Sequence, residues 1–84
     1  MNGKYEKGID RYIPEGVELS GTQQEYLKVA AGLYRLMDTV RMVDVARFMD
    51  KPTGTVCSAM EILSRKGVLE TDAKGVITLL EKET

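Results

Sequence analysis

Apolar positions recur along the chain with helical spacing in its first half. From residue 23 to 37 they return every three or four residues, as in a helix with one buried face. They are Tyr26, Leu27, Ala30, Leu33, Tyr34 and Met37. Thr22 and Glu25 occupy the two positions of a capping box, so Thr22 is expected to be the N-cap of a first helix at about 23–37. Gly32 inside it costs roughly 1 kcal/mol relative to alanine, which a close helix crossing would explain.

Two further helices are predicted in the middle of the chain. After a brief extended stretch at 40–42, an apolar face predicts a short second helix over 43–49, from Val45, Ala46, Phe48 and Met49. Pro52 suits the first position of a third helix, which the pattern places at about 53–65. Its inward residues are expected to be Val56, Ala59, Met60 and Leu63. Gly67 can then form the left-handed cap that ends it.

The two ends of the chain differ from this helical middle. The runs 68–71 and 76–80 are rich in β-forming residues and flank a turn at 72–75, which predicts a hairpin. Residues 1–21 show no sustained period and are interpreted as an irregular arm that packs on its own domain or on a second subunit. Together these elements predict an α+β, mainly α domain at 22–84. Its three helices and two-stranded C-terminal wing make it a winged helix-turn-helix.

Composition limits the possible functions. The chain has 84 residues, a single cysteine, Cys57, and no histidine, so it lacks an internal disulfide and the commonest general base and metal ligand. We expect one domain that is not an enzyme and uses no cofactor or metal. Neither a membrane-spanning apolar run nor a signal peptide is visible, so a cytoplasmic protein is expected. Cys57 near the start of the third helix fits a buried small residue better than a redox switch.

Candidate functional residues gather around the third helix. In a helix-turn-helix the second helix of the motif enters the major groove of DNA. Its leading end carries small polar residues that suit close approach to phosphates and base edges, namely Thr53, Gly54, Thr55 and Ser58. Lys51, Arg65 and Lys74 are the expected phosphate contacts. The same threonine and serine residues could instead serve only as local helix caps.

Several motifs resemble a known family. The segments Glu25-Tyr26-Leu27, Val40-Arg41-Met42-Val43-Asp44-Val45-Ala46 and Lys66-Gly67-Val68-Leu69-Glu70 resemble the N-terminal domain of iron- and manganese-dependent repressors of the diphtheria toxin repressor type. The resemblance covers about residues 22–82. It implies a winged helix that binds a palindromic operator as a dimer, with the third helix in the major groove. It places Thr53, Gly54, Thr55 and Ser58 toward the DNA and Arg65 where the family has a backbone-contacting arginine.

The departures from that family concern metal binding. Family members continue into a dimerisation and metal-binding domain, whereas this chain stops at Thr84 and has no histidine, so metal sensing is not expected. Glu25 stands where the family can place a metal ligand. Lys28, however, stands where manganese-type members have a glutamate, and a cation there opposes metal binding. Glu25 is therefore interpreted as a capping residue.

Charge leaves a second function open. The chain has 12 basic and 13 acidic residues, a net charge of -1, whereas DNA-binding domains are usually basic. The leading hypothesis is a transcription regulator, by resemblance a repressor, that binds duplex DNA with the third helix in the major groove and the wing on the backbone. The alternative is a winged-helix module for protein interaction or dimerisation. A homodimer through residues 1–21 and the first helix is expected in either case.

Overall fold

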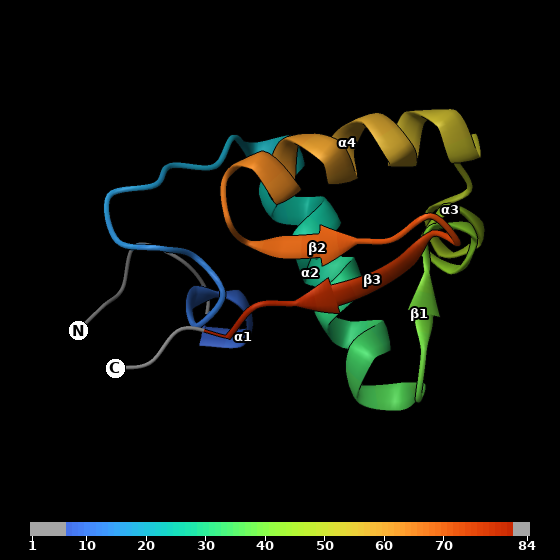
Figure 1. Ribbon diagram of the computed structural model, residues 1–84, viewed down its shortest axis with the longest axis horizontal. Coiled ribbons are helices and arrows are strands. Elements are labelled where there is room, and N and C mark those ends of the chain that lie inside the picture. Colours follow the sequence, from blue (N-terminus) through green and yellow to red (C-terminus); the bar gives the residue numbers. More distant parts are fainter. Residues whose placement is uncertain (1–6, 82–84) are drawn as a thin grey trace.

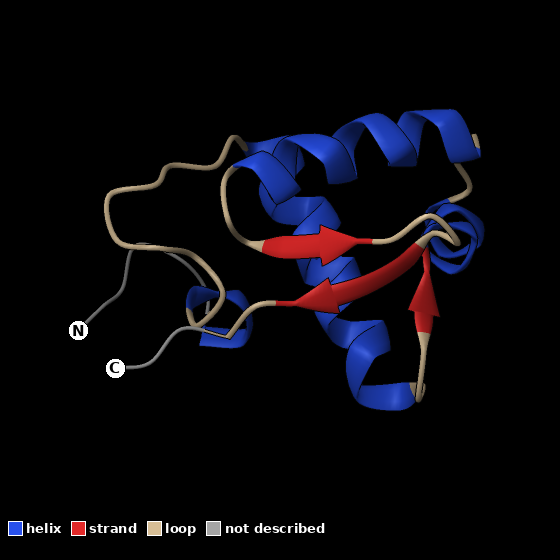
Figure 2. Ribbon diagram, in the orientation of Figure 1, coloured by secondary structure: helices blue, strands red, loops and turns tan. Residues whose placement is uncertain are grey.

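A computed structural model describes residues 7–81 and gives an α+β arrangement that is mostly helical (Figures 1 and 2). The elements follow one another as α1 (Lys7–Asp10), α2 (Gly21–Leu36), β1 (Val40–Arg41), α3 (Met42–Met49), α4 (Thr53–Arg65), β2 (Leu69–Thr71) and β3 (Val76–Leu79). The third predicted helix, now α4, and the hairpin of β2 and β3 are confirmed. Figure 1 shows α4 running along the long axis, with the β2–β3 turn beside α3.

The sheet has three antiparallel strands in the order β1-β3-β2, whereas the sequence pattern predicted two. The stretch expected to be merely extended is β1, in which Val40 pairs with Ile77 of β3. Leu69 of β2 pairs with Leu79 on the other edge of β3. A strand of two residues shows no periodicity, so only the tertiary pairing and the complete burial of Val40 reveal it.

The core lies between the three longer helices and one face of the sheet. In α4, Val56, Met60 and Leu63 are fully buried at helical spacing, as predicted, and Ala59 is half-buried. In α2 the buried residues are Tyr26, Leu27, Ala30 and Ala31. Burial of these side chains is the main stabilising term for so short a chain.

The first long helix begins two residues earlier than predicted. Ser20 is the N-cap of α2: its Oγ accepts a hydrogen bond from the Gln23 amide (3.1 Å), and Gln23 Oε1 accepts one from the Ser20 amide (2.9 Å). The predicted capping box at Thr22 and Glu25 is therefore wrong. Both Ser-x-x-Gln and Thr-x-x-Glu satisfy the motif, and the sequence alone does not choose between overlapping candidates.

The segment before α2 is more ordered than an irregular arm. It contains the helical turn α1, and its side chains Ile9, Ile13 and Leu19 belong to the buried core. This segment was expected to pack either on its own domain or on a second subunit. In the structure it packs on its own domain. Residues 1–6 lie outside the described part of the chain. The short helix was missed because the apolar positions of 9–19 follow no regular period.

The end of α4 is fixed by backbone geometry. Gly67 has φ +79°, and the amides of Gly67 and Val68 donate to the carbonyls of Ser64 (3.0 Å) and Leu63 (3.1 Å). This is the Schellman arrangement, which satisfies carbonyls at the helix end and favours glycine at the left-handed position. It turns the chain directly into β2, as the glycine predicted.

Several expectations about buried positions are wrong. On the predicted buried face of the first long helix, Tyr34 is 39% exposed, and Met37 is 37% exposed and follows the last residue of α2. Phe48 of α3 is 68% exposed, because the core side of this helix is formed by Met42, Val45 and Ala46. Gly32 is also exposed, and a Cβ added there would meet no heavy atom within 4 Å outside its own helix. No close helix crossing within the described chain therefore explains this glycine.

Candidate nucleic-acid interface

All seven residues predicted to contact DNA are solvent-exposed. They are Lys51, Thr53, Gly54, Thr55, Ser58, Arg65 and Lys74. Six of them lie on α4 or immediately before it, and Lys74 lies in the turn between β2 and β3. The structure brings most of this set to one end of the molecule, around the start of α4 and the β2–β3 turn (Figure 1).

One face of α4 is exposed along its whole length. Thr55, Ser58, Ile62 and Arg65 recur at spacings of three and four residues and are all exposed. This spacing places them on one side of the helix. Arg65 therefore shares a face with Ser58 but lies about 10 Å further along the axis, from the helical rise per residue. The face is uncharged at its start and basic at its end, with exposed Glu61 as its nearest acidic neighbour along the helix.

The start of α4 has open backbone donors. Pro52 is the N-cap and, contrary to expectation, not the first helical residue, and it offers no side-chain hydrogen bond. Its carbonyl accepts from the amides of Thr55 (3.1 Å) and Val56 (3.2 Å). The amides of Thr53 and Gly54 are the remaining first-turn donors. The small side chains at 53–55 leave them accessible, and such donors at the positive end of a helix suit an anion.

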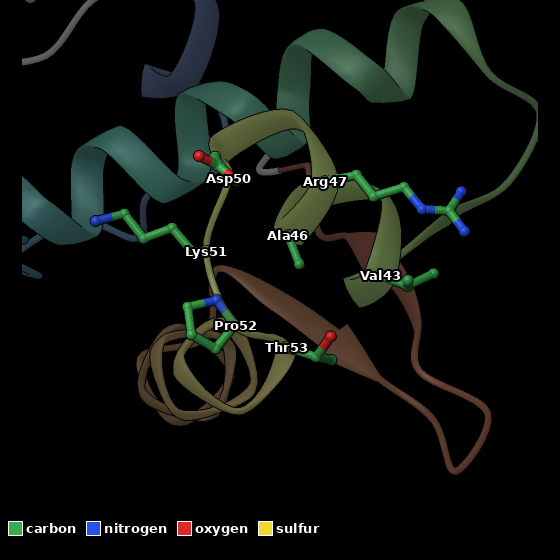
Figure 3. A pocket seen from close by; sticks show the side chains of 7 residues that line it. All are labelled: Val43, Ala46, Arg47, Asp50, Lys51, Pro52 and Thr53. Carbon is green, nitrogen blue, oxygen red and sulfur yellow. The ribbon is translucent and has the colours of Figure 1, made fainter.

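An open cleft of about 470 Å³ separates α3 from the start of α4. Its lining residues are Val43, Ala46, Arg47, Asp50, Lys51, Pro52 and Thr53 (Figure 3). The side chains of Arg47 and Lys51 point to opposite sides of the cleft in this view. Two cations therefore flank the connection between the helices, with Asp50 as the acidic member of the lining.

The connection itself is tight. Asp50 ends α3 with φ 57° and ψ 50°, and the Lys51 amide donates to the Ala46 carbonyl (3.0 Å). Residues other than glycine seldom adopt the left-handed backbone conformation, but aspartate is among those that tolerate it. This local geometry directs the chain from α3 into α4 within residues 50–52.

The β2–β3 turn is held against the start of α3. The Met42 amide donates to the Gly75 carbonyl (2.9 Å), and Asp72 Oδ1 accepts from the amides of Lys74 and Val76 (2.9 Å each). Gly75 has φ +82°, as the turn requires. Lys74 is therefore presented on a short, hydrogen-bonded turn next to α3.

Val43 and Arg47 belong to this site but were not predicted from the sequence. Neither was among the predicted DNA contacts, yet the two residues are four positions apart on α3, which places them on one side of the helix, and both line the cleft. The four-residue spacing of Val43 and Arg47 was the sequence signal that could have placed them on one surface. The predicted face of this helix comprised only Val45, Ala46, Phe48 and Met49, so Val43 and Arg47 were not assigned to a common surface.

The other candidate residues of the sequence are also placed by the structure within residues 7–81. No group of three or more cysteine or carboxylate side chains there lies close enough together to hold a metal ion. Glu25 is exposed and takes no part in the capping box of α2. Cys57 is half-buried against the core. No helix of this part of the chain is both long and apolar enough to cross a membrane.

Comparison with known proteins returned no relatives: no protein-family model, curated protein or solved structure matches this chain. The similarity to metal-dependent repressors therefore depends on the sequence motifs alone. The functional proposal that follows depends on the residues and geometry of this chain.

Proposed function

We propose that this domain is a winged helix-turn-helix that binds duplex DNA, with α4 in the major groove and the β2–β3 turn on the phosphate backbone. The element order supports the topology: α2, β1, α3 and α4 precede a hairpin whose second strand pairs with β1. In this arrangement α3 and α4 form the helix-turn-helix, and β2 and β3 form the wing.

The observation that carries the proposal is the exposed, uncharged face at the start of α4. Thr53, Gly54, Thr55 and Ser58 are small and exposed, and charged residues stand around them rather than among them. Hydroxyl and methyl groups suit hydrogen bonds and apolar contacts to base edges, and the open amides suit a phosphate. A helix surface meant only for solvation would ordinarily carry charged side chains at these positions.

Positive charge is local, in agreement with a chain whose net charge is -1. Arg47 and Lys51 flank the cleft, and Lys74 lies on the turn. Asp50 and Asp72 oppose them, so the proposed affinity is modest and depends strongly on salt. Each cation that neutralises a phosphate adds roughly 0.9 to the slope of log affinity against log salt concentration.

The proposal is tested by fluorescence anisotropy with a labelled mixed-sequence duplex. Lys51→Ala and Lys74→Ala should each weaken binding several-fold and reduce the salt slope by about 1. Ser58→Glu should weaken binding more, because it puts a carboxylate against the groove. Arg11→Ala is the matched control, since Arg11 lies beside α1 and pairs with Glu81 (3.5 Å). Equal loss in all four variants would contradict the proposed face.

A second function, association with another protein surface, is favoured by a different observation. A groove between α2 and α3 is lined by exposed apolar side chains, among them Leu36 (83% exposed) and Phe48 (68% exposed). The two sites share α3, which lines the cleft with Arg47 and the groove with Phe48. One function therefore does not exclude the other.

A further inference from the structure

Arg41 is the last residue of β1 and lies next to the β2–β3 turn. It pairs with Val76, which follows Lys74 by two positions. The next residue, Met42, begins α3, and its amide donates to the Gly75 carbonyl (2.9 Å). Figure 1 shows the end of β1 meeting this turn beside α3. Paired residues of antiparallel strands have Cα atoms about 5 Å apart, so Arg41 and Lys74 belong to one corner of the molecule.

The side chain of Arg41 is on the solvent side of the sheet. Successive residues of a strand face opposite sides, and in β1 Val40 is buried in the core while Arg41 is exposed. Within residues 7–81, neither Arg41 nor Lys74 forms an ion pair with an acidic side chain. Both positive charges at this corner are therefore available to an anionic ligand.

The aspartates that follow or precede these cations bond to backbone amides instead. Asp44 Oδ2 accepts from the Arg41 amide (2.9 Å), and Asp72 Oδ1 accepts from the Lys74 amide (2.9 Å). Each aspartate thus fixes the backbone of a basic residue and leaves its charged group unpaired. Glu70 is exposed on β2, and β3 separates that strand from β1.

We propose, resting on the DNA-binding function proposed above, that Arg41 is a second phosphate-binding residue of the wing and that Asp44 positions it. The helix α4 has no basic residue before Arg65, so positive charge near its start must come from neighbouring elements. A guanidinium binds a phosphate through two parallel hydrogen bonds, whereas an ammonium acts as a point charge. Arg41 therefore orients the wing on the backbone, and Lys74 adds attraction beside it.

Fluorescence anisotropy with a labelled mixed-sequence duplex, measured over a range of salt concentrations, tests the role of Arg41. Arg41→Gln should raise the dissociation constant several-fold at low salt and lower the slope of log affinity against log salt concentration by about 0.9. Arg41→Lys should keep the wild-type slope but bind more weakly, because it retains the charge without the paired hydrogen bonds. Arg41→Gln combined with Lys74→Ala should lower the slope by about 2.

Arg35→Gln is the matched control, because Arg35 is an exposed arginine on α2, outside the proposed face. It should leave both the affinity and the salt slope unchanged. Circular dichroism checks that each variant is folded.

Two substitutions of Asp44 separate its hydrogen bond from its charge. Asp44→Asn keeps an oxygen acceptor for the Arg41 amide and removes a negative charge, so it should bind DNA at least as tightly as the wild type. Asp44→Ala removes the same charge together with the acceptor, so it should bind several-fold more weakly and with a lower salt slope. A residue that acted only through its charge would give tighter binding in both variants.

The outcomes distinguish this inference from the proposed function. If Lys74→Ala lowers the affinity and the salt slope but Arg41→Gln changes neither, the role of Arg41 is overturned and the DNA-binding face stands. If the folded wild type does not bind the duplex at low salt, both are overturned. Equal binding by Asp44→Ala and Asp44→Asn would contradict the positioning role of Asp44.

Discussion

The ammonium group of Lys66 joins the end of α4 to the start of α2. Its Nζ donates to Gln23 Oε1 (2.9 Å) and to the Glu18 carbonyl (2.7 Å). The same Gln23 oxygen accepts from the Ser20 amide, so one side chain completes a helix cap and receives a lysine 43 positions further along. This contact holds the segment before α2 against α4, the helix proposed to enter DNA.

Replacement of Lys66 tests that connection. Lys66→Met keeps the aliphatic stem and removes both hydrogen bonds, so the free energy of unfolding should fall by about 1–2 kcal/mol. Urea denaturation followed by circular dichroism measures it. Lys51→Met, at an exposed position, should change stability by about 0.5 kcal/mol or less. Equal effects of the two substitutions would show that the Lys66 contacts contribute nothing.

The N-cap of α2 can be located by alanine substitution. Ser20→Ala should lower the free energy of unfolding by about 1 kcal/mol, because the Gln23 amide loses its acceptor. Thr22→Ala should be close to neutral, since Thr22 is already inside the helix. If Thr22→Ala lowered the thermal stability more than Ser20→Ala, the N-cap would lie at Thr22, as the sequence motif predicted.

Burial of Ile9 predicts that the N-terminal segment is part of the folding unit. Ile9 is 1% exposed in the core, so Ile9→Ala should lower the free energy of unfolding by about 2–4 kcal/mol. Arg11→Ala, in the same segment but exposed, should have little effect. Both variants are compared by thermal denaturation. A negligible change for Ile9→Ala would mean that the segment does not pack on the domain.

Two glycines should respond to alanine with opposite signs. Gly67 needs a positive φ, and an added Cβ would also lie 3.5 Å from Pro14 Cγ, so Gly67→Ala should destabilise the protein by about 1 kcal/mol. Gly32 is helical and its surroundings are open, so Gly32→Ala should stabilise the monomer by about 0.5–1 kcal/mol. These stabilities are measured in dilute solution, where a dimer does not contribute. Stability changes of the same sign at both positions would contradict the backbone conformations described for these two glycines.

Sequence patterns predicted the parts of the fold that depend on local chemistry. The bounds of α4, its glycine cap and the turn at 72–75 follow from proline, glycine and apolar spacing, and the structure confirms them. The role of β1 could not be predicted, because it arises from pairing with β3, in which Val40 pairs with Ile77, 37 positions later. Exposure of Phe48 was also hidden, since an eight-residue helix leaves its buried side ambiguous.

Part of the candidate site could also be predicted, because that part depends on the local sequence. The predicted contacts are visible in the sequence, and all seven are exposed in the structure: Lys51, Thr53, Gly54, Thr55, Ser58, Arg65 and Lys74. Of these, Lys51 and Thr53 line the cleft, and the cleft itself requires the turn at Asp50, which brings Arg47 of α3 to the same lining. The apolar groove between α2 and α3 depends on which faces the two helices leave uncovered, and no local pattern specifies that.

The central claim, that α4 and the β2–β3 turn form a DNA-binding face, is tested most directly by mapping it residue by residue. An unlabelled mixed-sequence duplex is added at low salt to the ¹⁵N-labelled protein, and amide shifts are followed by NMR. We predict that the largest changes fall at 53–58 and 72–75 and diminish as salt is raised, with little change at Lys7–Asp10. Absence of shifts in the folded protein, or shifts confined to the groove between α2 and α3, would contradict the claim.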